Sequence, residues 1–438
     1  MPDTGSTPPA PSPVAGGDAR GAAAECGTGR PCRFCGTPLR HLVVDLGTSP
    51  LCESFLTHEQ LFEMEPFYPL AVYICEGCAL AQVPAHVSGE TIFGTEYAYF
   101  SSFSDSWLRH CERYATMVIE RLGLGPHSQV VEVASNDGYL LRNFVARGIP
   151  ALGIEPAPNV AQAAIDQGVK TLVRFFGVET ARDLVREGTR ADLLAGNNVL
   201  AHVPDLNDFV EGLRILLAPR GVVTMEFPHL ARLVEGNQFD TIYQEHYCYF
   251  SLIAVRRVLA AHGLTLFDVE ELPTHGGSLR IYARHAEEDG PPVSPAVTAL
   301  AERETRAGYD RPETYRAFAT RVEETRLALL EFLIRARREG RTVAGYGAPG
   351  KGNTLLNYCG IRQDLLSYTV DRNPYKHGRY LPGTRIPVFP PGRLAETQPD
   401  YVLILPWNLR DEILEQLAYV RDWGGRCVIP IPRLEVVS

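Results

Sequence analysis

Two Cys-x-x-Cys pairs near the N-terminus constrain the fold of this 438-residue chain more than any other feature. Cys32 and Cys35 form the first pair, and Cys75 and Cys78 form the second. Each spacing puts two thiolates on one tight turn, and four thiolates satisfy a tetrahedral Zn²⁺ with no open position. The pairs therefore predict a structural zinc site with an insertion between its two knuckles. Unligated core cysteines or a redox pair are the alternatives.

Length and charge limit the remaining possibilities. At about 150 residues per domain, the chain should contain roughly three folded units. There are 42 Lys and Arg residues against 52 Asp and Glu residues, a net charge of −10 that argues against a nucleic-acid binder. The sequence has no apolar run long enough to span a bilayer and no secretion signal. We therefore expect a cytoplasmic protein that binds neither nucleic acid nor membrane. The oligomeric state stays open, and a monomer is compatible with the sequence.

Periodicity and composition divide the chain into five segments. Residues 1–30 are rich in Pro, Gly, Ala and Ser and predict a disordered tail, and 31–88 predict the zinc-binding domain. Strands alternate with helices over 89–285, which predicts an α/β domain of parallel strands with crossover helices. Residues 286–340 predict a linker with a long helix, and 341–438 predict a second, smaller α/β unit.

The segment VVEVASNDG, residues 130–138, is typical of a strand whose end binds a ligand. The next strand ends at Glu155, about twenty residues on, where a carboxylate accepts hydrogen bonds from ribose hydroxyls. The G-x-G-x-x-G pattern of dinucleotide sites is absent, and the loop instead resembles that of class I S-adenosylmethionine methyltransferases. Turn residues of an ordinary α/β fold are the alternative. The candidate cofactor-binding residues are Glu132, Ala134, Asn136, Asp137, Gly138, Glu155 and Asn198.

Several motifs occur together in one order: CRFCG, ICEGCALAQ, EVASNDGYLL, GIEPAPNVA, YQEHYCYFS, HGGSLRIY and GYGAPGKGNTLLNY. Over nearly everything after residue 30, the chain resembles the three-domain sugar C-methyltransferases that build branched deoxysugars for antibiotics. The resemblance implies a zinc-binding N-terminal domain, a central S-adenosylmethionine domain and a C-terminal Rossmann-like domain. It also implies a dTDP-linked 4-keto-6-deoxysugar as substrate. Two positions depart from common patterns: Ala134 replaces a frequent Gly, and Gly352 replaces the P-loop Ser or Thr, which argues against ATP hydrolysis.

Methylation of carbon requires a carbanion, and a 4-keto group acidifies the neighbouring C–H because the charge spreads onto oxygen. The reaction needs a base with a pKa near neutrality and donors for the enolate oxygen. We predict His246 as the base, with Tyr243 and His202 as donors to the keto oxygen. Glu245 is predicted to orient a histidine or bind a sugar hydroxyl, and Tyr97 matches a family position close to the substrate. Polar surface residues are the alternative reading.

A flexible, basic segment is predicted to bind the diphosphate of the substrate, because a guanidinium suits phosphate oxygens. The candidate substrate-binding residues are His275, Gly277, Ser278 and Arg280, with Lys351 and Asn353 from the C-terminal unit. The leading hypothesis is methyl transfer to C3 of the sugar. Transfer to C5 beside the same ketone, O-methylation of a reduced sugar, and a non-catalytic zinc and nucleotide scaffold are the alternatives.

Overall fold

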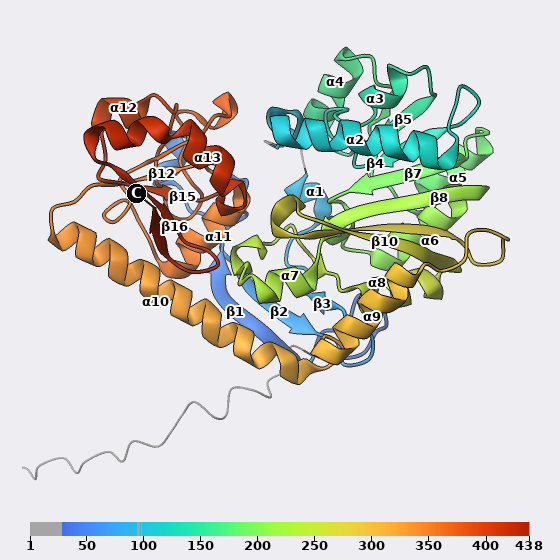
Figure 1. Cartoon of the computed structure of the whole chain (residues 1–438), viewed down its shortest axis with the longest axis horizontal. Helices are drawn as coiled ribbons and strands as arrows, with labels where there is room; N and C mark the ends of the chain where they lie inside the picture. The colour runs from blue at the N-terminus through green and yellow to red at the C-terminus, as the bar shows by residue number, and fades with distance from the viewer. Residues whose placement is uncertain (1–28, 94–96, 98, 438) are drawn as a thin grey trace, which may run out of the picture.

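Three β-sheets organise the chain in the computed structural model, which describes residues 29–93, 97 and 99–437 (Figure 1). The predicted N-terminal tail lies outside this range except for its last two residues, Gly29 and Arg30. The α/β class predicted from the sequence is confirmed. Among the described residues, no helix is both long and apolar enough to cross a bilayer.

The N-terminal sheet is antiparallel, in the order β1-β2-β3-β9. In β1 and β2 buried residues are interspersed with exposed or half-buried ones, so one face packs into the core and the other lies nearer solvent, whereas β3 and β9 are buried. The fourth strand comes from the middle of the chain, within the segment that the sequence assigns to the methyltransferase domain. The strands are β1 (His41–Ser49), β2 (Tyr68–Ile74), β3 (Ala81–Gln82) and β9 (Cys248–Tyr249).

The central sheet has seven strands in the order β10-β11-β8-β7-β4-β5-β6. The five strands from β8 to β6 are parallel, as predicted, whereas β11 runs antiparallel to both β8 and β10. The difference has a simple cause: a short loop joins β10 to β11, and a tight connection forces antiparallel neighbours. The strands are β4 (Val130–Val133), β5 (Ala151–Ile154), β6 (Thr171–Leu172), β7 (Ala191–Asn197), β8 (Leu217–Pro228), β10 (Leu264–Leu272) and β11 (Ser278–His285).

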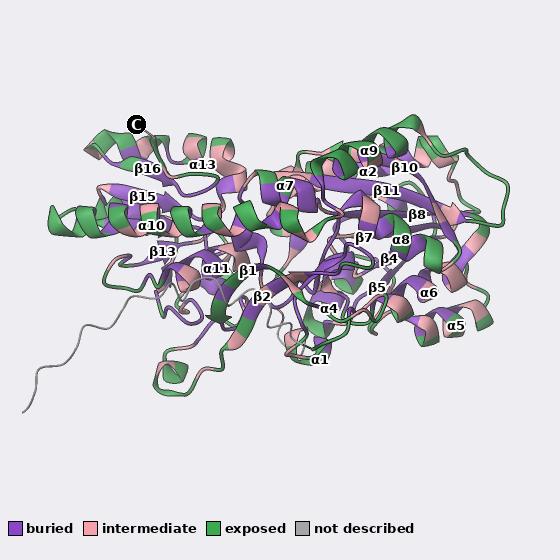
Figure 2. Cartoon of the chain, turned by 90° about the horizontal axis from the view of Figure 1, so that it is seen from below, coloured by how far each residue is buried: buried purple, intermediate pink, exposed green. Residues whose placement is uncertain are grey.

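Amphipathic helices cover this sheet, and Figure 2 shows buried strands between helices whose outer faces are exposed. The longest of them begins where the Ser104 side chain accepts the N–H of Trp107, which is a common N-terminal cap. It ends at Gly123 in the left-handed conformation, which is a common C-terminal cap. The helices of this part of the chain are α1 (Gly89–Ile92), α2 (Asp105–Leu122), α3 (Arg142–Val145), α4 (Pro158–Asp166), α5 (Val178–Arg186), α6 (Leu206–Leu216), α7 (Leu230–Glu235) and α8 (Leu252–Ala261). Of these, α7 packs into the core of the N-terminal and C-terminal sheets instead.

The C-terminal sheet has the order β14-β13-β12-β15-β16-β17, parallel except for its last strand. The strand that comes first in the chain, β12, leads directly into the helix α11, which is the Rossmann-like arrangement that the sequence predicts. The elements are β12 (Val343–Tyr346), α11 (Gly350–Cys359), β13 (Thr369–Val370), β14 (Val388–Phe389), α12 (Arg393–Thr397), β15 (Tyr401–Ile404), α13 (Arg410–Gln416), β16 (Arg426–Ile429) and β17 (Glu435–Val437).

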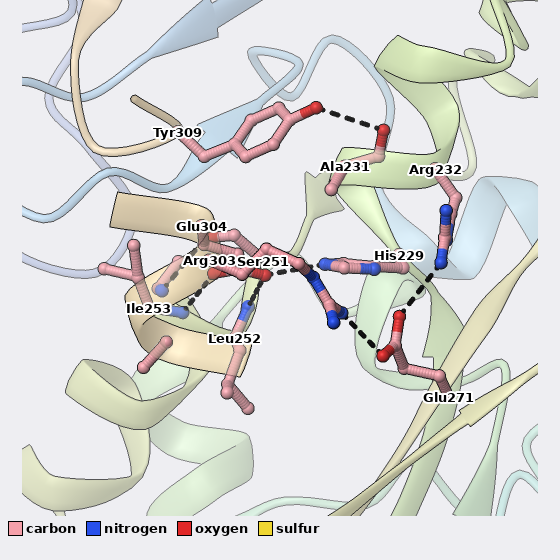
Figure 3. A network of polar contacts seen from close by, with 12 residues as sticks. His229, Ala231, Arg232, Ser251, Leu252, Ile253, Glu271, Arg303, Glu304 and Tyr309 are labelled. Carbon is pink, nitrogen blue, oxygen red and sulfur yellow. Dashed lines mark hydrogen bonds and ion pairs between the residues drawn. The ribbon is translucent and has the colours of Figure 1, made fainter. Parts of the chain in front are cut away.

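Two linker helices, α9 (Pro295–Ala307) and α10 (Arg316–Arg338), join the central and C-terminal units along the lower edge of Figure 1. Glu304 of α9 is buried and pairs with His229, with 2.6 Å between Oε1 and Nε2 (Figure 3). Its two oxygens also accept the N–H groups of Leu252 and Ile253 at 2.8 and 2.9 Å. One carboxylate therefore satisfies the first turn of α8, where unpaired N–H groups favour an anion.

Replacing Glu304 by Ala should lower the melting temperature. The change leaves His229 and two buried N–H groups without a partner, which costs about 3 kcal/mol and corresponds to roughly 5–10 °C for a unit of this size. Differential scanning calorimetry measures the shift. The matched control is Glu302→Ala, two residues before Glu304 on the exposed side of α9. Its melting temperature should stay within about 1 °C of the parent's. Equal melting temperatures for the two variants would contradict the assigned role.

Candidate functional site

A cavity of about 1010 Å³ lies where the three sheets meet. The ends of the parallel strands β4, β5 and β7 open into it through Val133, Ile154 and Asn197. This is the edge at which open α/β sheets bind their ligands. Residues of the N-terminal unit, such as Cys52, and of the C-terminal unit, such as Lys351, complete the lining. The cavity therefore exists only because all three units pack together.

The loop after β4 turns its backbone toward the cavity. Ala134 and Asn136 line it and adopt positive φ values of 54° and 49°. The N–H groups of Asn136 and Ala157 each donate to the Glu155 carboxylate at 2.9 Å. Glu155 also lines the cavity, and burial raises its pKa to about 7. This carboxylate is thus fixed at the site predicted for a ribose.

Three other predicted cofactor-binding residues support this loop from behind and do not line the cavity. Glu132 is fully buried, and burial raises the pKa of its carboxyl well above the usual value. Asp137 accepts the N–H of Ser102 at 3.1 Å, which ties the preceding segment to the loop. Gly138 has φ 79°, and a Cβ there would lie 3.0 Å from Val169. Asn198, the seventh predicted residue, does line the cavity.

The predicted catalytic histidines lie together. The ring centroids of His202 and His246 are 4.6 Å apart, and the Tyr243 ring is 4.0 Å from His246. His246 Nδ1 lies 2.9 Å from the carbonyl of Thr241, to which it donates, so Nε2 is the nitrogen left to accept a proton. Burial lowers the pKa of His246 well below its usual value and that of His202 to about 4. Both imidazoles are neutral at pH 7.

Glu245 lies between the N-terminal and central units. The Cys52 thiol donates to Oε1 at 3.4 Å, and the Tyr97 hydroxyl donates to Oε2 at 3.2 Å. Burial and the nearby Glu53 carboxyl raise the pKa of Glu245 to about 8. The structure thus brings all five predicted catalytic residues to the same cavity.

Only two of the six predicted substrate-binding residues, His275 and Lys351, line the cavity. His275 Nε2 lies 3.1 Å from Asn198 Nδ2. The Lys351 ammonium donates to Asn408 Oδ1 at 2.8 Å and lies 4.9 Å from the Trp407 ring centroid, and burial lowers its pKa. A buried cation held by an amide and an aromatic ring retains the ability to attract an anion.

The other four predicted substrate-binding residues do not line the cavity and instead contact other residues of the chain. Arg280 is buried and pairs with Glu226 at 2.6 Å and Glu270 at 3.1 Å, because all three lie on neighbouring strands. The remaining contacts are as follows: Ser278 Oγ donates to the Thr274 carbonyl, the Gly277 carbonyl accepts the His229 N–H, and Asn353 Nδ2 donates to the Cys52 carbonyl.

Several cavity residues escaped the sequence analysis, among them Cys52, Glu53, Trp107 and His110. Cys52 and Glu53 reach the cavity from the N-terminal unit, where Glu53 pairs with the buried Lys376 at 3.3 Å. No local spacing marks either residue, because their partners lie far away in sequence. Trp107 and His110 stack at 5.0 Å on α2, a spacing of three that the sequence analysis could have taken as one helix face.

Comparison with known proteins now decides the family. One family model, described as "C-methyltransferase C-terminal domain", matches residues 273–432. Models described as "Putative zinc binding domain" and "Methyltransferase domain" match 32–93 and 107–269. The chain is 37% identical over 407 residues to the C-methyltransferase NovU of Streptomyces niveus, spanning 93% of this chain and 96% of that protein. The chain belongs to this C-methyltransferase family.

Two more distant matches each cover less than half of this chain. A ubiquinone biosynthesis O-methyltransferase of Bartonella tribocorum is 25% identical over 96 residues, 22% of this chain and 39% of that protein. The solved structure of magnesium protoporphyrin IX methyltransferase from Synechocystis PCC 6803 with bound S-adenosylmethionine covers 46% of this chain and 99% of that chain. Its sequence identity is 14% and its TM-score 0.32. The predicted class, an S-adenosylmethionine-dependent C-methyltransferase, is confirmed by the family.

The C-methyltransferase brings its four predicted metal ligands together. The Sγ atoms of Cys32, Cys35, Cys75 and Cys78 all lie within 4.8 Å of one another. The Cys32–Cys78 and Cys35–Cys75 pairs are 3.6 and 3.5 Å apart. A tetrahedral Zn²⁺ with bonds of about 2.3 Å needs sulfur atoms roughly 3.8 Å apart. The four cysteines therefore fit a structural zinc ion, with no position open for a substrate.

Binding of S-adenosylmethionine should weaken as the pH falls through 7. Hydroxyl donors favour the ionised form of Glu155, whose pKa in the free protein is about 7, so protonation competes with the ligand below that value. The dissociation constant should rise about fivefold between pH 7 and pH 6, as measured by calorimetry. Glu155→Gln should bind at least about tenfold more weakly and lose this pH dependence. The same slope in that variant would contradict the assignment.

Proposed function

We propose that this C-methyltransferase methylates C3 of a dTDP-linked 4-keto-6-deoxysugar, beside the ketone, through an enolate. The observation that carries the proposal is the His246 imidazole, neutral and held by the Thr241 carbonyl, with its second nitrogen available at a cavity shared by three units. The similarity to NovU supports transfer to carbon. The ordered motifs of the sequence support a sugar nucleotide as the acceptor.

His246 is proposed to take the proton from C3. Sequence reasoning expected an imidazole that titrates near neutrality, but burial lowers the pKa of His246 far below that range in the ligand-free protein. The low pKa keeps the ring in its basic form at every working pH. A dianionic diphosphate and a developing enolate both favour imidazolium, so substrate binding raises the basicity of Nε2 at the moment it is needed.

Donors around the base are proposed to stabilise the enolate oxygen. The Tyr243 ring packs on His246, and burial together with nearby carboxyls raises the pKa of Tyr243 well above its usual value, so its hydroxyl keeps its proton. The His202 ring lies 4.6 Å from that of His246 and lines the same cavity, and it is proposed as the second group that contacts the substrate oxygen. When bound, S-adenosylmethionine supplies the electrophilic methyl group that the carbanion accepts, with S-adenosylhomocysteine as the product.

Glu245 and Tyr97 are proposed to bind the sugar hydroxyls, and Lys351 and His275 the diphosphate. The protonated Glu245 carboxyl and the Tyr97 hydroxyl lie 3.2 Å apart and present matched donors and acceptors. Lys351 reaches the cavity from the C-terminal unit, so a substrate that contacts both Lys351 and Glu245 bridges two units. The cavity of about 1010 Å³ is large enough for S-adenosylmethionine and a sugar nucleotide together.

The first test uses His246→Asn in deuterated buffer with a dTDP-4-keto-2,6-dideoxyhexose. The variant keeps a polar side chain but loses the base, so deuterium uptake beside the ketone should fall at least about a hundredfold. Affinity for S-adenosylmethionine should stay within about twofold, because the cofactor loop is untouched. Mass spectrometry and NMR measure the exchange and locate the new methyl group. Exchange at the parent rate would contradict the role of His246.

The same NMR spectrum separates the alternatives. A methyl group on C5 would replace the C3 assignment while keeping the enolate mechanism. Methyl transfer to oxygen, or to a reduced sugar without a ketone, would overturn the mechanism. If several 4-keto sugar nucleotides gave neither exchange nor methylation while S-adenosylmethionine still bound, this substrate class would be wrong.

Glu245 is a second candidate for the base, since its pKa of about 8 lies close to the working pH. A carboxylate base would make deuterium uptake rise with pH up to about 8, because only the ionised form accepts a proton. With His246 as the base, Glu245→Gln should retain most of the exchange and show no rise near pH 8. A loss of exchange in Glu245→Gln, with normal exchange in His246→Asn, would reverse the two roles.

A further inference from the structure

The first zinc knuckle touches both loops that carry the candidate catalytic histidines. Arg33 lies between two of the predicted metal ligands, Cys32 and Cys35. Its guanidinium donates to the carbonyl of Pro204 at 2.8 Å and to that of Val83 at 2.6 Å. It also lies 5.1 Å from the centroid of the Tyr247 ring. Pro204 closely follows His202 in the chain and Tyr247 directly follows His246, so one side chain joins both loops.

The backbone of Tyr247 links the same elements. Its N–H donates to the Ala201 carbonyl at 2.8 Å, and its carbonyl accepts the N–H of Val83 at 3.0 Å. Tyr247 is only 1% exposed, so these bonds are shielded from water. On the other side of the knuckle, Asn207 Nδ2 donates to the Phe34 carbonyl at 3.0 Å. The loop that contains His202 is therefore held by the knuckle on its C-terminal side and by Tyr247 on its N-terminal side.

A buried glutamine connects this contact to the predicted metal site. Gln82 Nε2 donates to Cys32 Sγ at 3.1 Å, and Gln82 Oε1 accepts the backbone N–H of Arg33 at 3.0 Å. Gln82 lies on β3, directly opposite Cys248 of β9. The conformation of the Cys32–Cys35 turn, which the four thiolates define, is thus transmitted through hydrogen bonds to the strand that follows His246.

We propose that Arg33 is a positioning residue through which the metal-bound knuckle sets the spacing of His202 and His246. The proposal rests on the proposed function for the roles of those two histidines. The geometry needs a guanidinium, because its planar fork serves two carbonyls in different directions while its face packs on an aromatic ring. An ammonium is a single point charge and serves one of the carbonyls at a time. The zinc site then contributes to the chemistry as well as to the fold.

The first test measures hydrogen exchange and needs no substrate. The variants are Arg33→Lys and Arg33→Met, and Arg40→Met is the matched control, because Arg40 is an exposed residue of the same unit. In Arg33→Met, peptides covering 199–205 and 243–249 should exchange at least about tenfold faster than in the parent. The control should match the parent. Each variant should still hold one zinc ion per chain, and peptides of α7 should be unchanged.

Removal of zinc from the parent by a chelator should give the same local pattern, with fast exchange in those two peptides. Fast exchange everywhere in the N-terminal unit of Arg33→Met, or a lower melting temperature with no local change, would mean that Arg33 only stabilises the fold and would overturn the proposal. If the methionine variant does not fold, the same exchange experiment is made with Arg33→Lys, which keeps the positive charge but lacks the planar guanidinium that donates to two carbonyls.

The second test separates positioning from binding. In Arg33→Lys, kcat for methyl transfer should fall at least about tenfold while the KM for S-adenosylmethionine stays within twofold, because the cofactor loop lies elsewhere. An unchanged kcat would overturn the proposal. The two proposals fail in different ways: if the parent enzyme acts on no 4-keto sugar, the substrate assignment is wrong, and the exchange experiment still decides whether Arg33 couples the knuckle to the loops.

Discussion

The segment from Tyr243 to Phe250 is shared by two sheets, and the cavity depends on this sharing. Its residues Cys248 and Tyr249 form β9, the fourth strand of the N-terminal sheet. Phe250 pairs with His229, which follows β8 of the central sheet, and its carbonyl accepts the N–H of Leu230 at 2.9 Å. The residues just before β9 cannot shift without breaking bonds to one sheet or the other. The polar residues around His246 are therefore anchored to both sheets.

The N-terminal unit contacts both of the other units, and its contacts with the C-terminal unit lie beside the cavity. Asn353 of α11 donates to the Cys52 carbonyl, and a Cβ at Gly350 would lie 2.9 Å from Cys52 Sγ, so only glycine allows this close approach. Next to it, Lys376 pairs with Glu53 and donates to the Ala348 carbonyl at 2.8 Å. Breaking a buried ion pair leaves a costly uncompensated charge. These contacts fix the C-terminal unit at the cavity, where it contributes Lys351.

How far the sequence predicts this structure depends on the distance between partners. Adjacent residues with a fixed spacing, such as Cys32 and Cys35 or the loop from Ala134 to Gly138, could be assigned because their geometry is local. Arg280 could not: its side chain appears free in sequence, but strand pairing places it opposite Glu226 and beside Glu270. The order of strands in the sheet decides which side chains lie beside Arg280, and no local sequence pattern predicts that order.

The same limit explains the residues that the sequence analysis missed. Cys52 meets Glu245 across 193 positions of the chain, and no periodicity connects them. The sequence assigns residues 31–88 to a zinc-binding domain, and no local pattern shows that β9 completes its sheet or that its residues line the cavity. The catalytic candidates Tyr243, Glu245 and His246 could be predicted because they lie in one short motif. Their pKa values could not be predicted, since burial is a property of the assembled units.

Burial acts on the cavity in two opposite directions, and together they determine its charge. Loss of water disfavours any charged group, so it raises the pKa of Glu245 to about 8 and lowers those of His202 and His246. At pH 7 the carboxyl is mostly protonated and both imidazoles are neutral. These three side chains thus carry little charge before ligands enter. In the proposed reaction, charge then develops only between the substrate and the base, where the low dielectric strengthens each favourable contact.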